Sequence, residues 1–141
     1  MAFTVPSYDL KDKVAIITGS TRGIGNAIAH TMAAYGAAVV ITGRKQEQCD
    51  AVAAEIEAAG GKALGVATDV TNAAARENLI AKTVEKFGHL DILVNNAGLG
   101  GQPKKMIDMD EDYFNKYVDA DYKGLYFMSQ LAARQMKIGR A

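Results

Sequence analysis

The sequence has only one cysteine and no net charge. Its single cysteine, Cys49, excludes an intrachain disulfide and is typical of a reducing compartment, so we expect a cytoplasmic protein with an inert structural thiol. Sixteen basic residues balance sixteen acidic ones, so the composition favours neither nucleic acid nor a membrane surface as a partner. No stretch approaches the roughly 20 apolar residues of a membrane span, and residues 1–12 lack an apolar segment of signal-peptide length. The two histidines, His30 and His89, form no constellation of ligands, so we expect no metal site.

The rest of the sequence alternates short apolar runs with longer helical patterns. The runs are typical of strands covered on both faces, and they lie at Val14–Thr18, Ala38–Thr42, Ala63–Ala67 and Leu90–Asn95. Helical spacing predicts helices at Ile24–Tyr35, Gln46–Ala59, Ala73–Phe87 and Glu111–Lys137. Strict alternation with short connections predicts one α/β domain, residues 1–141, built on a parallel sheet with right-handed crossovers.

A glycine-rich segment connects the first predicted strand to the first predicted helix. Its residues are Thr18, Gly19, Ser20, Thr21, Arg22, Gly23, Ile24 and Gly25. A tight strand-to-helix turn needs backbone torsions that a Cβ would hinder. The free N–H groups of a helix N-terminus also bind anions such as a pyrophosphate. We interpret the segment as a phosphate-binding turn, with a purely structural turn as the alternative.

Two further segments lie, like the glycine-rich segment, directly after predicted strands. They are Asp69-Val70 after the third strand and Asn95-Asn96-Ala97-Gly98 after the fourth. Together with the G-x-x-x-G-x-G spacing of the first turn, they resemble the short-chain dehydrogenase/reductase family, from about Leu10 to the end of the sequence. The resemblance implies a Rossmann-type doubly wound sheet of strand order 3-2-1-4 and a nicotinamide cofactor. It also implies an oxidoreductase that interconverts a small alcohol with a ketone or aldehyde, similar to 3-oxoacyl or small-ketone reductases.

The resemblance also indicates where the cofactor binds. In a sheet of this order, ligands bind at the carboxyl ends of the first and fourth strands, where the strand order reverses. By resemblance, Asp69 contacts the adenine, Asn96 holds the central strands, and the backbone at Ala97 and Gly98 passes the adenosine ribose. The full set expected to bind the cofactor is Gly19, Ser20, Thr21, Arg22, Gly23, Ile24, Gly25, Arg44, Asp69, Val70, Asn96, Ala97 and Gly98. For Asp69 a second interpretation stays open, in which the carboxylate only caps the following helix.

The end of the second predicted strand indicates which nicotinamide cofactor is bound. NAD-binding Rossmann domains usually carry an acidic residue here, which binds the ribose 2′-hydroxyl. This sequence has Gly43 at that position, followed by Arg44. A glycine leaves room for a 2′-phosphate, which Arg44 can bind in bidentate fashion and Arg22 can also reach. We therefore expect NADP(H), with NAD(H) as the alternative if Arg44 and Lys45 are only solvated residues at a helix start.

The last predicted helix carries one unusual acidic residue. Asp110 is the expected N-cap, and the helix should bury one apolar face made of Phe114, Tyr117, Val118, Leu125, Met128 and Ala132. Asp121 lies on that face, where the related enzymes typically have an asparagine that is said to hold a water in the proton relay. Two interpretations stay open: Asp121 is a catalytic residue, or it is a tolerated exchange at a half-buried site.

The serine and the Tyr-x-x-x-Lys pair that deliver the proton in this family do not occur in the sequence. We therefore expect the chain to be the cofactor-binding half of the domain, truncated before the fifth strand and unable alone to reduce a carbonyl. An uncovered fourth strand and an apolar helix face would favour a homo-oligomer joined at Leu90–Asn95, at Glu111–Lys137, or at both. Two alternatives remain: a half-domain that binds nucleotide without turnover, and a chain that serves only as an assembly surface.

Overall fold

A parallel four-stranded sheet forms the centre of the computed structural model, which describes residues 8–101 and 104–138. The strands, in chain order, are β1 (Val14–Ile17), β2 (Ala38–Gly43), β3 (Lys62–Ala67) and β4 (Ile92–Val94). Their order across the sheet is β3-β2-β1-β4, and every pairing is parallel. This confirms the expected doubly wound architecture, in which the strand order reverses between β1 and β4. Residues 1–7, which belong to the N-terminal segment without a signal-peptide pattern, lie outside the described ranges.

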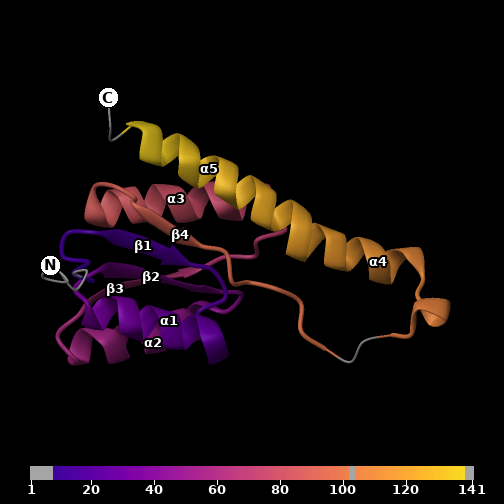
Figure 1. Cartoon of the computed structure of the whole chain (residues 1–141), viewed down its shortest axis with the longest axis horizontal. Coiled ribbons are helices and arrows are strands. Elements are labelled where there is room, and N and C mark those ends of the chain that lie inside the picture. Colours follow the sequence, from indigo (N-terminus) through magenta and orange to yellow (C-terminus); the bar gives the residue numbers. More distant parts are fainter. Residues whose placement is uncertain (1–7, 102–103, 139–141) are drawn as a thin grey trace, which may run out of the picture.

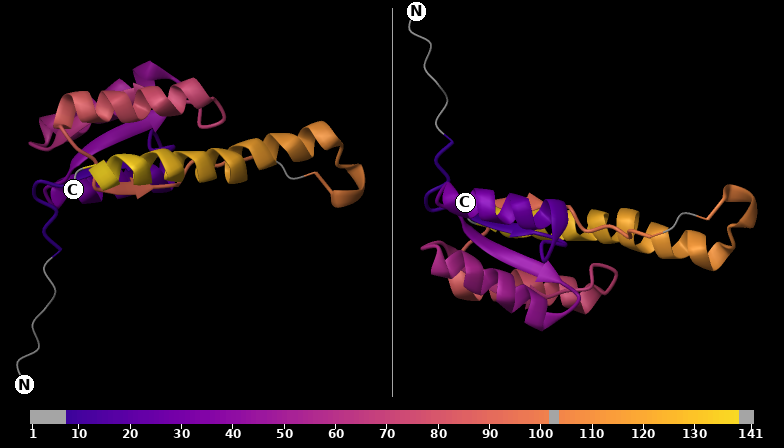
Figure 2. Two further views of the ribbon diagram at one scale, coloured as in Figure 1. Left: turned by 90° about the horizontal axis from the view of Figure 1, so that it is seen from above. Right: turned by 90° about the horizontal axis from the view of Figure 1, so that it is seen from below.

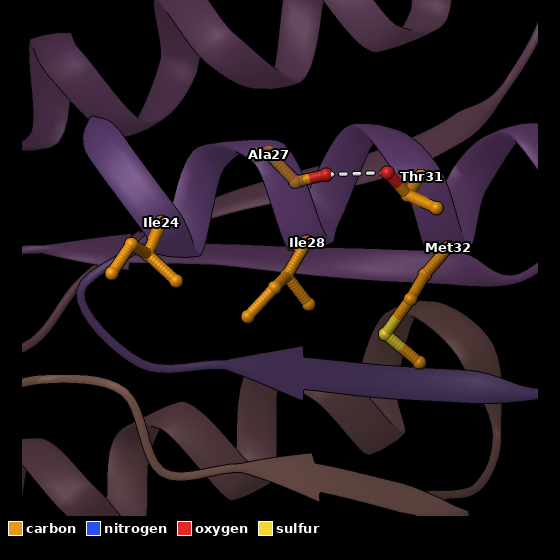
Figure 3. Close-up of a pocket in the computed structure, with 5 residues that line it drawn as sticks. All are labelled: Ile24, Ala27, Ile28, Thr31 and Met32. Atoms are coloured by element: carbon orange, nitrogen blue, oxygen red, sulfur yellow. Dashed lines mark hydrogen bonds between the residues drawn. The ribbon is translucent and has the colours of Figure 1, made fainter.

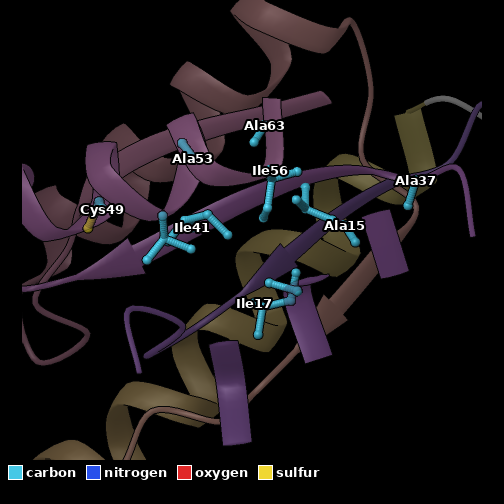
Figure 4. Close-up of a cluster of buried hydrophobic side chains, with 11 residues drawn as sticks. Ala15, Ile17, Ala37, Ile41, Cys49, Ala53, Ile56 and Ala63 are labelled. Carbon is cyan, nitrogen blue, oxygen red and sulfur yellow. The ribbon is translucent and has the colours of Figure 1, made fainter. Parts of the chain in front are cut away.

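Helices cover both faces of the sheet (Figures 1 and 2). The helices on one face are α1 (Gly23–Ala34) and α2 (Gln46–Ala58), and those on the other are α3 (Ala73–Phe87) and α5 (Leu125–Ile138). Side chains alternate along each strand, so Ala15 and Ile17 pack toward α1 and α2 (Figure 4), whereas Ile16 packs toward α3 and α5. Among the described residues, no helix is both long enough and apolar enough to cross a membrane.

The boundaries of α3 follow from local chemistry. The Asn72 side chain is the N-cap and accepts a hydrogen bond from the Ala75 N–H at 2.9 Å. At the other end, Gly88 adopts a left-handed conformation with φ 86°, which a Cβ would disfavour. The predicted limits of this helix are therefore confirmed at both ends. Asp69 is not its cap.

Cys49 lies within α2, and its side chain is fully buried. Its thiol points to the Gly43 carbonyl oxygen, 3.7 Å away. Burial raises the pKa of the Cys49 thiol, with a smaller contribution from the nearby carboxylate of Asp50. The thiolate is therefore disfavoured, in keeping with a structural residue.

The predicted helix at Glu111–Lys137 is not one continuous α-helix. After a short 3₁₀ turn, η1 (Met106–Asp108), the structure has α4 (Glu111–Tyr117), a π-helical segment η2 (Val118–Gly124), and then α5. Asp110 is the N-cap as predicted, since its carboxylate accepts the Tyr113 N–H at 2.7 Å. A π-helix bonds i to i+5 and is wider than an α-helix, so residues on either side of η2 do not share one α-helical register.

The expected apolar face of this helix is consequently wrong in part. Phe114 is 57% exposed and Leu125 is 41% exposed, although both were expected to be buried. The buried residues recur every four positions and are mostly small: Ala120, Gly124, Met128 and Ala132. This spacing is wider than the 3.6 residues of an α-helical turn. The π segment therefore moves the buried stripe away from the large apolar side chains.

The fourth strand is shorter than predicted. Only Ile92–Val94 pair with β1, and β4 lies at the edge of the sheet. Leu90 is buried, but it packs in the core ahead of the strand. Asn95 and Asn96 follow the last paired residue, so their polar groups bond to other parts of the chain.

Candidate functional site

The turn after β1 packs directly on the loop after β4. Gly19 has φ +65°, and a Cβ there would lie 2.9 Å from the Cα of Ala97. At Gly25, a Cβ would collide with the side-chain amide of Asn96 and would lie 2.6 Å from the Gly19 carbonyl oxygen. These two glycines therefore allow the two predicted motifs to approach each other. The structure brings both motifs to the carboxyl edge of the sheet.

Thr18 and Asn96 connect the ends of β1 and β4. The Thr18 hydroxyl accepts the N–H groups of Asn96 (3.0 Å) and Ala97 (2.9 Å) and donates to the Val94 carbonyl (3.3 Å). In return, the Asn96 amide donates to the carbonyl oxygens of Thr18 (2.9 Å) and Gly19 (3.1 Å). The position of the loop after β4 is therefore set by groups on the two residues that follow β1.

Ser20 lies beneath the turn and is fully buried. Its hydroxyl donates to the Ile17 carbonyl at 2.7 Å and accepts the Thr42 N–H at 2.9 Å. The Thr42 hydroxyl in turn accepts the Gly19 N–H at 3.1 Å. Because these bonds occupy the Ser20 hydroxyl, the residue supports the turn from below rather than offering its side chain to a ligand.

The N-terminus of α1 presents uncapped backbone donors. Arg22, the residue before the helix, is extended, and its side chain makes no capping hydrogen bond. Gly23 and Ile24 follow in the first turn, both exposed, and nothing lies within 4 Å of a Cβ built on Gly23. The first backbone N–H groups of an α-helix have no partner inside the helix, and such groups suit a phosphate group. The site therefore fits the pyrophosphate of a dinucleotide on the evidence of its own backbone.

At the end of β2, Gly43 is packed against Thr21 of the glycine turn. A Cβ on Gly43 would lie 2.7 Å from the Thr21 methyl carbon and 3.2 Å from its hydroxyl oxygen. On this side, the space beside the glycine is filled by Thr21 and is not open to a ligand. Arg44 is exposed and follows directly. Within the part of the chain that the structure describes, no hydrogen bond or ion pair involves the side chains of Arg22 or Arg44.

Asp69 begins a short turn after β3. One carboxylate oxygen accepts both the Thr71 N–H (2.9 Å) and the Thr71 hydroxyl (2.7 Å). These two hydrogen bonds lower the pKa of Asp69, and the positive charge of Arg44 adds a smaller effect in the same direction. Asp69 is therefore an exposed, ionised acceptor at the same edge as Arg44.

Asp121 is exposed and not half-buried as expected, because the buried stripe runs through Ala120 and Gly124. Its Oδ1 accepts the Leu99 N–H at 2.8 Å, and the same oxygen would lie 3.4 Å from a Cβ on Gly98. The carboxylate therefore holds the loop after β4. Across residues 8–101 and 104–138, no group of three His, Cys, Asp or Glu side chains could hold a metal ion.

An apolar groove of about 370 Å³ runs along α1 from its first turn. It is lined by Ile24, Ala27, Ile28, Thr31 and Met32, and Figure 3 shows Ile24, Ile28 and Met32 on one side of the helix. None of these side chains ionises, and the only hydroxyl, on Thr31, donates to the Ala27 carbonyl. The groove therefore offers no reactive group.

Sequence reasoning missed several residues that shape this edge. Thr18 and Thr42 could have been found, since a threonine at the end of an otherwise apolar strand is a polar group in need of a partner. Gly124 gave no such signal. Arg76 precedes Leu79 and Ile80 by three and four positions, so helical spacing places it on the buried face of α3, where it is 6% exposed.

The chain is similar to known proteins over most of its length. A family model described as short chain dehydrogenase matches residues 13–141. "Tropinone reductase-like 3" from Erythroxylum coca is 39% identical, with 90% of this chain and 49% of that protein covered. "L-rhamnose 1-dehydrogenase (NAD(P)(+))" from Azotobacter vinelandii is 42% identical, with 91% of this chain and 51% of that protein covered. A solved short-chain type dehydrogenase/reductase from Mycobacterium marinum superposes with a TM-score of 0.88 at 35% identity, covering 92% of this chain and 52% of its own. The chain thus spans about half the length of these relatives.

The Asp69 carboxylate should titrate below its usual value of 3.8 because Thr71 stabilises the charged form. The substitution Thr71→Val removes the hydroxyl donor but keeps the N–H, so the pKa of Asp69 should rise part of the way toward 3.8. A depressed folded-state pKa stabilises the fold above the unfolded pKa of about 3.9, and this stabilisation disappears as the pH falls through the folded value. Carboxyl ¹³C NMR titration measures the shift, with Thr31→Val, on exposed α1, as the control. An Asp69 midpoint that is identical in wild type and Thr71→Val would refute the assignment.

Proposed function

This chain belongs to the short-chain dehydrogenase/reductase family, and we propose that it binds NADP(H) in preference to NAD(H) along the carboxyl edge of its sheet. One observation supports the binding site above others: the N-terminus of α1 carries no side-chain cap and opens onto free space at Gly23. Members of the family use nicotinamide dinucleotides. The donors available on this backbone suit the pyrophosphate that such dinucleotides share.

The remaining parts of the dinucleotide are assigned to the neighbouring loops. The turn from Gly19 to Gly25 holds the pyrophosphate through its backbone. Asp69 and Val70 border the adenine, and the backbone of Ala97 and Gly98 borders the adenosine ribose. Asn96 acts indirectly, because its amide is taken up by the carbonyl oxygens of the turn. These assignments rest on the family and on the common location of all three loops at one edge of the sheet.

The preference for NADP(H) rests on charge. A 2′-phosphate needs cations and no competing carboxylate at the end of β2, and this chain carries Arg44 after a glycine. The Arg44 and Arg22 side chains are exposed and available. The role of Gly43 differs from the sequence-based expectation, since Thr21 fills the space beside it. In this proposal Gly43 contributes by the absence of a carboxylate, and Arg44 supplies the attraction.

We propose that the protein is an oxidoreductase that interconverts a small alcohol and a ketone or aldehyde. When bound, a reduced nicotinamide supplies the hydride for a carbonyl carbon. The carbonyl oxygen then gains negative charge and needs positioned donors and a general acid. Asp121 cannot serve as that acid while it is ionised, because a carboxylate repels the developing charge. Its bond to the Leu99 N–H supports the structural interpretation, in which Asp121 positions the loop after β4.

A second candidate is a module that binds nucleotide without turnover. It is favoured by the observation that the uncapped α1 turn and its supports, Ser20, Thr18 and Asn96, all lie within one described sheet edge. Nucleotide binding would then need no other part of a larger domain. The mass of the intact protein separates the candidates, since a molecule heavier than 15.0 kDa favours the complete oxidoreductase.

We also propose that copies of this chain associate. β4 forms one edge of the described sheet, and edge strands with open backbone groups favour association. Exposed apolar side chains also gather along η2 and α5, namely Tyr122, Leu125, Tyr126 and Phe127. A cytoplasmic location completes the proposal and is supported by the single buried cysteine.

Replacing Arg44 should weaken NADPH binding selectively. A hydrogen bond to a charged group contributes about 1.5–3 kcal/mol, so Arg44→Ala should weaken NADPH binding roughly ten- to hundredfold and leave NADH almost unchanged. Titration of both cofactors measures the effect, with Lys45→Ala as a matched control at the neighbouring exposed cation. An equal loss for both cofactors, or no loss, would rule out the assignment.

A protein of only these 141 residues should bind NADPH without oxidising it. The physical reason is the lack of an acid, since general acid–base help typically contributes about a hundred- to ten-thousandfold in rate. The measurement is NADPH oxidation by mass-verified protein with a panel of small ketones and ketoesters. Turnover above background would show this expectation to be wrong. Loss of that turnover in both Asp121→Ala and Asp121→Asn would favour Asp121 as the acid, because asparagine can still accept the Leu99 N–H.

Sedimentation at micromolar concentration should show a species heavier than the 15.0 kDa chain. Tyr126→Glu places a charge on the exposed face of α5 and should shift the distribution toward the monomer. Tyr35→Glu, at a similarly exposed tyrosine beyond α1, should leave it unchanged. A stable monomer of the unmodified protein under these conditions would contradict the proposal.

A further inference from the structure

Arg76 is a buried cation in α3. Its side chain is 6% exposed, and one terminal nitrogen donates to the Val70 carbonyl oxygen at 2.7 Å. The guanidinium carbon lies 5.5 Å from the centre of the Phe127 ring of α5. Among the described residues no carboxylate pairs with it, and its Nε is buried without a partner. A buried arginine is normally paired with an acid, so the burial of Arg76 without a carboxylate partner needs another explanation.

The carbonyl that Arg76 holds is itself a contact point between two segments. A Cβ on Gly124 of η2 would lie 2.9 Å from the Val70 carbonyl oxygen, so the loop after β3 rests on the π-helical segment. Three residues earlier in η2, Asp121 holds the Leu99 N–H of the loop after β4. The two loops that border the proposed nucleotide site are therefore both supported by η2. In Figure 1, η2 is the stretch of ribbon that joins the helices labelled α4 and α5.

We propose that Arg76 is a positioning residue for the adenosine half of the cofactor. It holds the Val70 carbonyl against η2 and thereby sets the position of the Asp69–Thr71 turn, which borders the adenine. The proposal rests on the proposed nucleotide site. A charged donor forms a stronger hydrogen bond to a carbonyl than a neutral one, and the ring of Phe127 gives the cation a favourable face. A side chain of similar length without a donor, such as methionine, could fill the space but could not hold the carbonyl.

A purely structural role would give a different result. If Arg76 only filled space, its replacement would lower the stability of the whole fold, and all ligands would lose affinity in parallel. If it positions the loop after β3, the loss falls on ligands that contact that loop. The turn at α1 is held separately, by Ser20 and Thr42, and should keep its affinity for phosphate groups.

The experiment compares two probes on five proteins. Adenosine 2′,5′-bisphosphate reports the adenosine half, and inorganic pyrophosphate reports the α1 turn. The proteins are the wild type, Arg76→Met, Arg76→Lys, Phe127→Leu, and the control Arg134→Met, which removes an exposed arginine of α5. Calorimetry gives both affinities, and urea unfolding gives the stability of each variant.

Arg76→Met should weaken binding of adenosine 2′,5′-bisphosphate about tenfold, the effect of one charged hydrogen bond, and leave pyrophosphate binding unchanged. Arg76→Lys, which keeps a cationic donor, should recover part of the loss. Phe127→Leu should give a smaller loss in the same direction and serves if Arg76→Met does not fold. Equal losses for both probes, or none in Arg76→Met and Phe127→Leu, would overturn the inference. If the wild type binds neither probe, the proposed nucleotide site fails instead.

Discussion

The hydrogen bonds between Thr18 and Asn96 are the connection on which the rest of this edge depends. The Thr18 hydroxyl takes two N–H groups from the loop after β4, and the Asn96 amide returns two bonds to the turn after β1. A parallel sheet has no hairpin to join neighbouring strands, so these bonds extend the connection between β1 and β4 beyond the last paired residues, Ile17 and Val94. Gly19 and Gly25 follow from this arrangement, because the two loops meet at their backbones.

The second support of this edge comes from the segment between α4 and α5. The π-helical segment η2 contacts the loop after β3 through Gly124 and the loop after β4 through Asp121. In a regular α-helix, Gly124 and Asp121 would face in other directions relative to the buried residues of α5. A π-helical segment often occurs at functional sites, and here it lets one short stretch support both loops. The acidic residue at the family's asparagine position is thus part of the support, as its bond to Leu99 indicates.

The elements around the first three strands were predictable because each carried a strong local signal. Unbroken apolar runs identified β1 to β3 to within one residue at each end, and the N-cap Asn72 and Gly88 delimit α3 as expected. The family motifs predicted which strand ends would meet. The last helix was not predictable, since the large apolar residues Phe114 and Leu125 suggested a stripe that the π segment displaces. The partner of buried Arg76 could not be predicted either, because it is a backbone carbonyl that no side-chain pattern reports.

The contact between Gly43 and Thr21 links two positions that lie far apart in the sequence. Any residue larger than glycine at the end of β2 needs the Thr21 side chain to move or to become smaller, since the gap for a Cβ is only 2.7 Å. A carboxylate, the usual means of selecting NAD, would therefore displace the Thr21 side chain or require a smaller residue at position 21. A single substitution at Gly43 would act on the turn after β1 as well as on the end of β2. The side chain at the end of β2 and the conformation of the glycine turn are in that sense sterically coupled.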